Sequence, residues 1–124
     1  MSLEEKTFKV YLIEDEPVLC ELFLELFSEE GIEISTFTSP LEALTRARDE
    51  PPNLYFIDYR LPEMNGDELA QSLTDQAPKY LLTGDLNAKA KHSFNEILSK
   101  PFDVNKIKSI ICSHVENYKR GLLA

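Results

Sequence analysis

The stretch LYFIDYRLPEMNG, residues 54–66, decides how this chain folds. Four apolar residues run directly into the carboxylate of Asp58, without the polar alternation of a half-exposed strand, and this predicts a strand buried on both faces. Pro52 and Asn53 precede the strand, and a loop rich in Pro, Asn and Gly follows it. Asp58 therefore ends a buried strand, the position at which open parallel sheets bind their ligands.

A second segment near the N-terminus has the same form. Residues 8–13 are mainly apolar, and Glu14, Asp15 and Glu16 follow at once. If the two strands are neighbours, their terminal acids converge at one edge of the sheet. Two carboxylates about 4 Å apart repel each other by about 4 kcal/mol at an effective dielectric constant near 20, so ionised acids there need a cation. Hard oxygen donors in an open cleft suit Mg²⁺.

Strands and helices are predicted to alternate along the whole chain. Pro17 opens a helix that Gly31 stops. Ser39 and Glu42 are predicted to form a capping box that opens a second helix, which runs through Arg48. Asp103 caps the final helix, which should end before Gly121. That helix carries an apolar stripe of Val104, Ile107, Ile111, Val115 and Tyr118. The other predicted elements are strands at 32–37, 79–83 and 97–100 and helices at 67–73 and, more weakly, 86–93.

This alternation predicts an α/β fold with a doubly wound, five-stranded parallel sheet and helices on both faces. The strand order expected for a flavodoxin-like sheet is 2-1-3-4-5, in which the first and third strands are neighbours. The polar composition of strand 32–37 places it at the sheet edge. Glu14, Asp15 and Asp58 are then expected to meet.

Composition and charge narrow the functional classes. The 124 residues, 43% of them hydrophobic, are enough for one domain covering 1–124, with 1–6 expected to be a flexible extension. A net charge of -9 argues against binding to a nucleic acid backbone. A polar N-terminus and the lack of a long apolar run argue against a signal peptide and a membrane span, which favours the cytoplasm. Cys20 and Cys112 are expected to be buried free thiols on helices.

Two further strand ends supply complementary groups. Thr83 ends the fourth predicted strand with a hydroxyl, and Lys100 ends the fifth with an ammonium group. Mg²⁺ and Lys100 could neutralise a transferring phosphoryl group while Asp58 attacks it as a carboxylate nucleophile. The residues alone leave other readings open: Thr83 could simply satisfy backbone groups after its strand, and Lys100 could be a surface lysine before a proline turn.

Four motifs in order resemble the response-regulator receiver domains of two-component signalling, the CheY-like superfamily. They are LIEDEP at 12–17, FID at 56–58 with LPEMNG at 61–66, LTG at 82–84 and KPF at 100–102. The resemblance spans nearly the whole chain. It implies a regulatory domain and no enzyme beyond self-phosphorylation and slow self-dephosphorylation.

The resemblance also implies roles for individual residues. Asp58 would accept the phosphoryl group, Thr83 and Lys100 would contact that group, and Glu14, Asp15, Asp58 and the backbone carbonyl of Arg60 would hold Mg²⁺. The phosphodonor would be a phosphohistidine on a sensor histidine kinase or a histidine phosphotransfer protein. Phosphorylation would switch the binding of a downstream target or the formation of a homodimer.

The chain departs from the family pattern before Lys100. Family members usually carry an aromatic residue three positions before this lysine, where this chain has Ile97, and a Gly-Ala pair where it has Ser93 and Phe94. The segment between Thr83 and the lysine is also short. The usual output face is therefore expected to be altered.

The same residues bear on three rival functions. A flavodoxin-type cofactor binder needs a Gly, Ser or Thr-rich phosphate loop after the first strand, and here that loop is acidic. A phosphatase with an aspartyl-phosphate intermediate would carry an acid at position 60, which is Arg60. A receiver-like interaction module that works without phosphorylation stays as the alternative.

Overall fold

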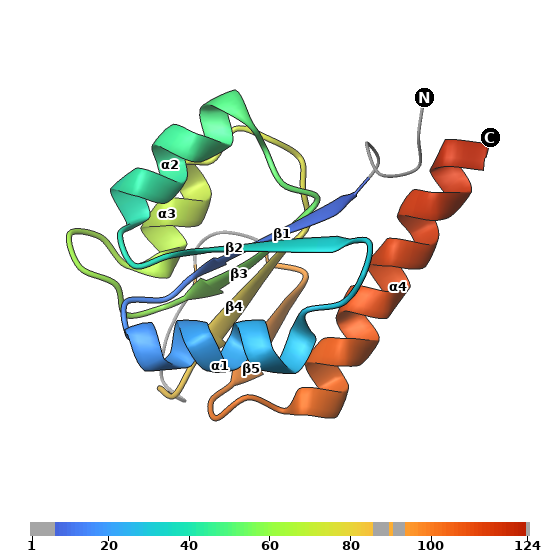
Figure 1. Ribbon diagram of the computed structural model, residues 1–124. Coiled ribbons are helices and arrows are strands. Elements are labelled where there is room, and N and C mark those ends of the chain that lie inside the picture. Colours follow the sequence, from blue (N-terminus) through green and yellow to red (C-terminus); the bar gives the residue numbers. More distant parts are fainter. Residues whose placement is uncertain (1–6, 86–89, 91–93, 124) are drawn as a thin grey trace.

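The computed structural model describes residues 7–85, 90 and 94–123, which form one five-stranded parallel sheet with helices on both faces (Figure 1). The strand order β2-β1-β3-β4-β5 confirms the predicted flavodoxin-like topology. The strands are β1 (Phe8–Ile13), β2 (Ile32–Phe37), β3 (Leu54–Asp58), β4 (Lys79–Thr83) and β5 (Glu96–Ser99). The helices are α1 (Pro17–Phe27), α2 (Pro40–Asp49), α3 (Gly66–Ser72) and α4 (Val104–Leu123).

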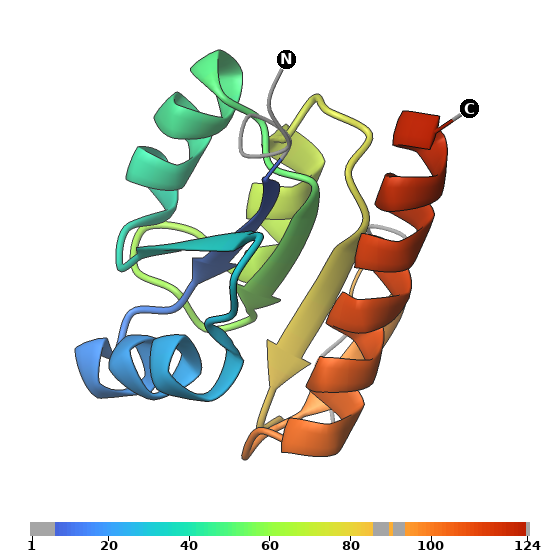
Figure 2. The ribbon, with the colours of Figure 1, turned by 45° about the vertical axis from the view of Figure 1, so that its right-hand side comes forward.

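The core has two sides, one on each face of the sheet. Alternate residues of the central strands point to opposite faces, so Phe56 packs beneath α1 and α4 while Tyr55 and Ile57 pack beneath α2 and α3. Figure 2 shows the pair α1 and α4 on one side of the sheet and the pair α2 and α3 on the other. All five residues of β3 are buried, as the unbroken apolar run predicted.

Local sequence sets where the helices begin. Ser39 Oγ accepts a hydrogen bond from Glu42 N at 3.4 Å, and Asp103 Oδ1 accepts one from Lys106 N at 3.1 Å, which confirms both residues as caps. At Ser39 this is one half of the predicted capping box. Asn65 forms a capping box with Glu68, so α3 begins at Gly66, one residue earlier than predicted.

Several predicted boundaries were wrong. Helix α1 ends at Phe27 rather than near Gly31, because Ser28 is already extended and Gly31, with a positive φ of 87°, makes the turn into β2. Helix α4 continues through Gly121 to Leu123. Strand β5 is one residue ahead of its predicted position and ends at Ser99.

Two expectations fall outside the described residues. The weak helix predicted at 86–93 lies in a segment of which only residue 90 is described, so the structure does not test it. The predicted N-terminal extension, 1–6, is likewise not described. In the described part of the chain, no helix is both long enough and apolar enough to cross a lipid bilayer.

The cysteine prediction was half right. Both thiols are free, but only Cys20 is buried, on the inner face of α1. Cys112 is exposed, because it lies just outside the apolar stripe of α4, whose buried members include Ile107 and Ile111.

A buried lysine lies at the opposite end of the sheet from Asp58. Lys79, the first residue of β4, is 6% exposed, and its Nζ donates to the carbonyl oxygens of Asp75 (3.1 Å) and Ala77 (2.9 Å). The ammonium also lies 5.1 Å from the centre of the Tyr55 ring, whose hydroxyl donates to Asp75 Oδ2 at 2.5 Å. Burial lowers the pKa of Lys79. The loop between α3 and β4 thus folds around an internal cation.

Candidate functional site

A pocket of about 540 Å³ opens at the carboxyl ends of β1, β3, β4 and β5. This is the edge at which the sequence placed the acids, and it is where parallel sheets bind ligands. The pocket is lined by Glu14, Asp15, Glu16, Asp58, Arg60, Thr83, Gly84, Asp85 and Lys100. Every residue proposed for the site from sequence lines this one pocket.

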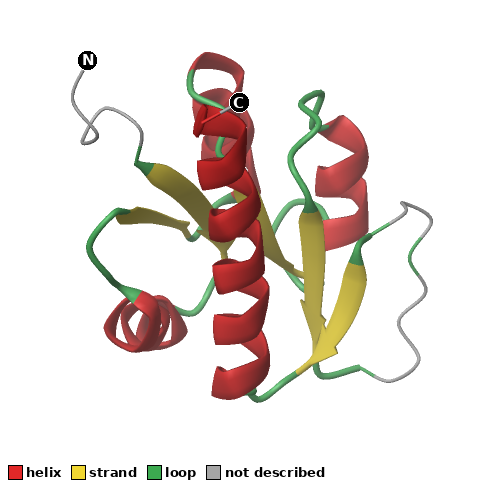
Figure 3. Cartoon of the chain, turned by 90° about the vertical axis from the view of Figure 1, so that its right-hand side faces the viewer, coloured by secondary structure: helices red, strands yellow, loops and turns green. Residues whose placement is uncertain are grey.

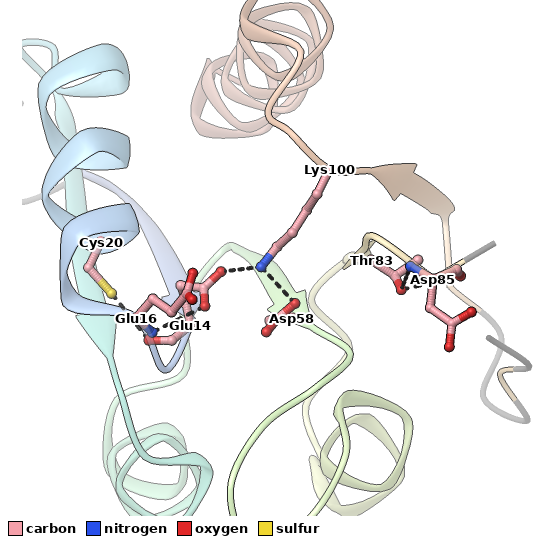
Figure 4. Close-up of polar contacts among 7 residues, drawn as sticks. All are labelled: Glu14, Glu16, Cys20, Asp58, Thr83, Asp85 and Lys100. Carbon is pink, nitrogen blue, oxygen red and sulfur yellow. Dashed lines mark hydrogen bonds and ion pairs between the residues drawn. The ribbon is translucent and has the colours of Figure 1, made fainter. Parts of the chain in front are cut away.

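Lys100 joins two of the acids (Figure 4). Its Nζ lies 2.6 Å from Glu14 Oε1 and 3.0 Å from Asp58 Oδ1, so one ammonium group lies between the carboxylates that end β1 and β3. The side chain of Glu14 is fully buried and that of Asp58 is 6% exposed. Charge-assisted hydrogen bonds of this length are strong where water is excluded.

Burial shifts the pKa values of Glu14, Asp58 and Lys100. Loss of solvent raises the pKa of both Glu14 and Asp58, and the nearby ammonium of Lys100 opposes that rise. Burial alone would lower the pKa of Lys100, but its hydrogen bonds to the two carboxylates leave that pKa above its ordinary value. The lysine is therefore fixed as a cation.

The third acid is placed differently. Asp15 is exposed at the mouth of the pocket, whereas Glu14 also accepts a hydrogen bond from Glu16 N at 3.2 Å. Carboxylate oxygens of Glu14, Asp15 and Asp58 all lie within 4.8 Å of one another. These hard oxygen donors, concentrated at one point, fit the ligand preference of Mg²⁺. Glu16 occupies the position before α1, but its side chain makes no capping hydrogen bond.

The loop after Asp58 is shaped by a close backbone approach at Gly66. A Cβ atom added to Gly66 would lie 2.3 Å from the carbonyl oxygen of Asp58, so this position has no room for a side chain. Gly66 N also donates to the carbonyl oxygen of Tyr59 at 2.7 Å. The sequence predicts Gly66 only as a loop residue, and the structure shows that its lack of a side chain lets the loop approach the end of β3.

Thr83 faces a neighbour that the sequence reading missed. Its Oγ1 accepts a hydrogen bond from Asp85 N at 3.0 Å, and Figure 4 shows the two residues together, apart from the bonds that join Lys100 to Asp58. Asp85 Oδ2 in turn lies 2.8 Å from Arg60 Nη2, which ties the loop after β4 to the loop after β3. The signal in the sequence for the contact between Thr83 and Asp85 is that the aspartate follows the Thr83-Gly84 pair directly.

The comparisons with known proteins agree with this geometry. The model of the response regulator receiver domain matches residues 10–112. The polar-differentiation response regulator DivK of Brucella ovis is 29% identical over 119 residues, which cover 88% of this chain and 97% of DivK. The transcriptional regulatory protein CrdR of Helicobacter pylori is 31% identical over 112 residues, which cover 83% of this chain. This chain spans about half the length of CrdR, since the match covers 53% of that protein.

Solved structures show the same fold. TrrA of Thermotoga maritima, a response regulator crystallised in complex with Mg(2+)-BeF, is 26% identical, with a TM-score of 0.77 over 87% of this chain and 99% of TrrA. The signal receiver domain of an HD domain-containing protein from Pseudomonas fluorescens Pf-5 has a TM-score of 0.81 at 20% identity, over 92% of this chain and 98% of that domain.

A parallel sheet in this order, with acids and a lysine gathered at its carboxyl edge, defines the CheY-like class of α/β domains. Together with the family match over most of its length, this means that the chain belongs to the response regulator receiver domains of two-component systems. Such domains are regulatory.

Proposed function

We propose that this domain accepts a phosphoryl group on Asp58 from a phosphohistidine of a sensor histidine kinase or phosphotransfer protein, and that the modification switches partner binding. The observation that carries the proposal is the position of Lys100 Nζ, 3.0 Å from Asp58 Oδ1. Glu14 and Asp58 both lie beside this cation and within the cluster of candidate metal ligands. Glu14 is fully buried, with one oxygen on Lys100 and the other on Glu16 N, which favours Asp58 as the nucleophile.

The transfer needs only one bond to form and one to break. A carboxylate oxygen of Asp58 attacks the phosphorus atom, the bond between phosphorus and the donor imidazole nitrogen breaks, and the nitrogen keeps the electron pair. Lys100 offsets negative charge on the phosphoryl oxygens as that bond breaks. Because Lys100 is already positioned by Glu14 at 2.6 Å, little reorganisation is required for this contact.

Glu14, Asp15, Asp58 and the backbone carbonyl of Arg60 would hold Mg²⁺. The metal, when bound, would neutralise charge on the phosphoryl oxygens and orient them. The exposed carboxylate of Asp15 gives an ion access from solvent, while Glu14 is engaged with Lys100 on one oxygen and Glu16 N on the other.

Thr83 would contact the phosphoryl group in the modified state. In the described structure its hydroxyl accepts from Asp85 N, so this hydrogen bond would have to open. Movement of Thr83 would carry the signal into the loop that begins at Gly84. Ile97 is 51% exposed on β5 and has no ring that could follow the threonine, so the signal would leave through the backbone.

Incubation with acetyl phosphate and Mg²⁺, followed by intact mass measurement, tests the proposal. We expect one added phosphate that hydroxylamine releases, because acyl phosphates are labile. Asp58→Asn should abolish the label, and the matched change Asp75→Asn, at the far end of the sheet, should leave it intact. An acid-stable label, or a label that survives Asp58→Asn, would overturn the proposal. A chain that takes no label but binds a partner would be the phosphorylation-independent interaction module.

A further inference from the structure

The outer edge of β2 carries backbone groups that are not paired by any strand of the described residues. Hydrogen bonds from Phe8 N to Gly31 O and from Glu14 N to Phe37 O show which backbone groups pair with β1. The N–H and C=O groups of the odd-numbered residues of this segment point toward β1. Because backbone direction alternates along a strand, the N–H and C=O groups of Ile34 and Thr36 face the other way. In the described part of the sheet β2 is the last strand on that side, and it is outermost in Figures 1 and 2.

A groove runs beside this edge on the α2 side of the sheet. It has a volume of about 580 Å³ and lies between the end of β2, at Thr36 and Phe37, and the outward face of α2, including Leu41, Glu42 and Asp49. We call it the β2–α2 groove. Leu41 is 50% exposed in it, which gives the groove an apolar contact next to unpaired backbone groups.

Acids outnumber bases around the groove. Glu42 and Asp49 line it and are exposed. Glu33 points to the same face of the sheet as Phe37, next to Lys9 of β1, which pairs with Glu50 at 3.8 Å. The basic residue that lines the groove, Arg46, is paired with Glu50 at 3.6 Å. A second copy of this chain, with its own net charge of -9, would bring like charges together here.

We propose that the β2–α2 groove binds an extended, basic segment of a partner protein, which adds to the sheet as a strand beside β2. Backbone hydrogen bonds to Ile34 and Thr36 would give affinity. Every second side chain of the added strand would face the α2 side, where apolar side chains would contact Leu41 and basic side chains would pair with Glu42 and Asp49. This interaction goes beyond the phosphoryl chemistry and does not require it.

Amide hydrogen exchange of the full chain, followed by NMR, tests the proposal at single residues. The probe is an eight-residue peptide of alternating lysine and valine, blocked at both ends; its control alternates glutamate and valine. With the lysine peptide at saturation, we expect exchange at Ile34 and Thr36 to slow at least tenfold. Glu33 and Ser35, whose amides already face β1, should change less than twofold. The glutamate peptide should have no effect.

Paired charge reversals separate the groove from general attraction to an acidic protein. Glu42→Lys with Asp49→Lys should weaken peptide binding at least fivefold. Glu21→Lys with Glu25→Lys, which makes the same change in net charge on exposed positions of α1, should alter it less than twofold. The proposal would be overturned if both double variants lost peptide affinity equally, or if no binding were seen at millimolar peptide. It would also be overturned if exchange slowed at Glu33 and Ser35 as much as at Ile34 and Thr36. A dimer in sedimentation that protects the same two amides would show that a second copy occupies the edge, and would also overturn it.

Discussion

The Tyr80 hydroxyl and His114 Nε2 lie 2.7 Å apart and join β4 to α4, on the side of the core that α1 and α4 cover. Tyr80 is 7% exposed, and its ring also meets the His114 ring edge-on at 5.7 Å. Burial lowers the pKa of His114. The contact therefore joins α4 to the sheet through a histidine whose neutral form is favoured by burial.

His114→Phe keeps the ring and removes the hydrogen bond. We expect it to lower the free energy of unfolding by about 1 kcal/mol at pH 7.5, since a buried hydroxyl loses its partner. Because the folded-state pKa of the histidine is below its unfolded value, its contribution is present above that unfolded value and is lost as pH falls through the folded pKa. The difference in free energy of unfolding between the original protein and His114→Phe, measured by urea unfolding, should narrow from pH 7.5 to pH 5. A difference that stays constant or widens in acid would contradict this.

Gly66→Ala should be strongly destabilising. The added methyl group would lie 2.3 Å from the carbonyl oxygen of Asp58, so the loop must shift, at about 3 kcal/mol by analogy with overpacked sites. Gly121→Ala is the matched control, because nothing lies within 4 Å of its added methyl group and the residue is helical. That control should be neutral or stabilise by up to about 1 kcal/mol. Thermal unfolding of both variants checks the pair, and equal effects would exclude the close approach as the cause.

Lys100→Met should destabilise the domain by on the order of 3 kcal/mol at pH 7.5, because it leaves the carboxylates of Glu14 and Asp58 buried without their cation. The raised folded-state pKa values of these acids mean that their ionisation opposes folding as pH rises through them. The loss should therefore shrink as pH falls and the carboxyl groups become neutral. Lys106→Met breaks an exposed pair with Glu96 and should change stability by less than about 1 kcal/mol. Urea unfolding at pH 7.5 and pH 4.5 distinguishes the two.

Asp15→Asn should weaken Mg²⁺ binding at least tenfold while leaving the metal-free stability nearly unchanged. Asp15 is exposed, so removing its charge does not disturb the buried pair of Glu14 and Lys100. Calorimetric titration with MgCl₂ measures the first effect, and thermal unfolding in a chelator measures the second. Undiminished Mg²⁺ affinity would remove Asp15 from the ligand set.

The amide of Asp85 should report the active state. If Thr83 moves to a phosphoryl group, Asp85 N loses its acceptor at 3.0 Å and should exchange faster. The experiment compares amide exchange with and without Mg²⁺ and beryllofluoride, a phosphoryl mimic, and the largest changes are expected between residues 84 and 94. Thr83→Ser should behave like the original chain. A response limited to the loop after Asp58 would show that the signal leaves by another face.

Sequence reasoning worked best where backbone geometry and hydrophobic patterning agree. The buried run before Asp58 predicted β3 to the residue, and the placement of Glu14, Asp58, Thr83 and Lys100 at strand ends brought them to one pocket. Strand ends of a parallel sheet converge whatever the side chains are, so topology alone carried this part of the site.

The sequence did not predict contacts that depend on tertiary packing. Nothing in the order of residues says that Lys79 is buried among carbonyl oxygens, since lysine at the start of a strand is ordinarily exposed. The ion pair of Arg60 and Asp85 joins residues 25 positions apart, and the exposure of Cys112 depends on how α4 is rotated. The close approach of Gly66 to Asp58 is likewise a property of the folded loop.

The ammonium of Lys100 gives the pocket an internal counterion before any metal arrives. Glu14 and Asp58 therefore do not need Mg²⁺ to coexist in the folded state, and the sheet edge can form without it. If Mg²⁺ takes part in the proposed phosphoryl transfer, a chelator should leave a domain that is folded but does not react, and free divalent ions would then control the reactivity of the protein and not its stability.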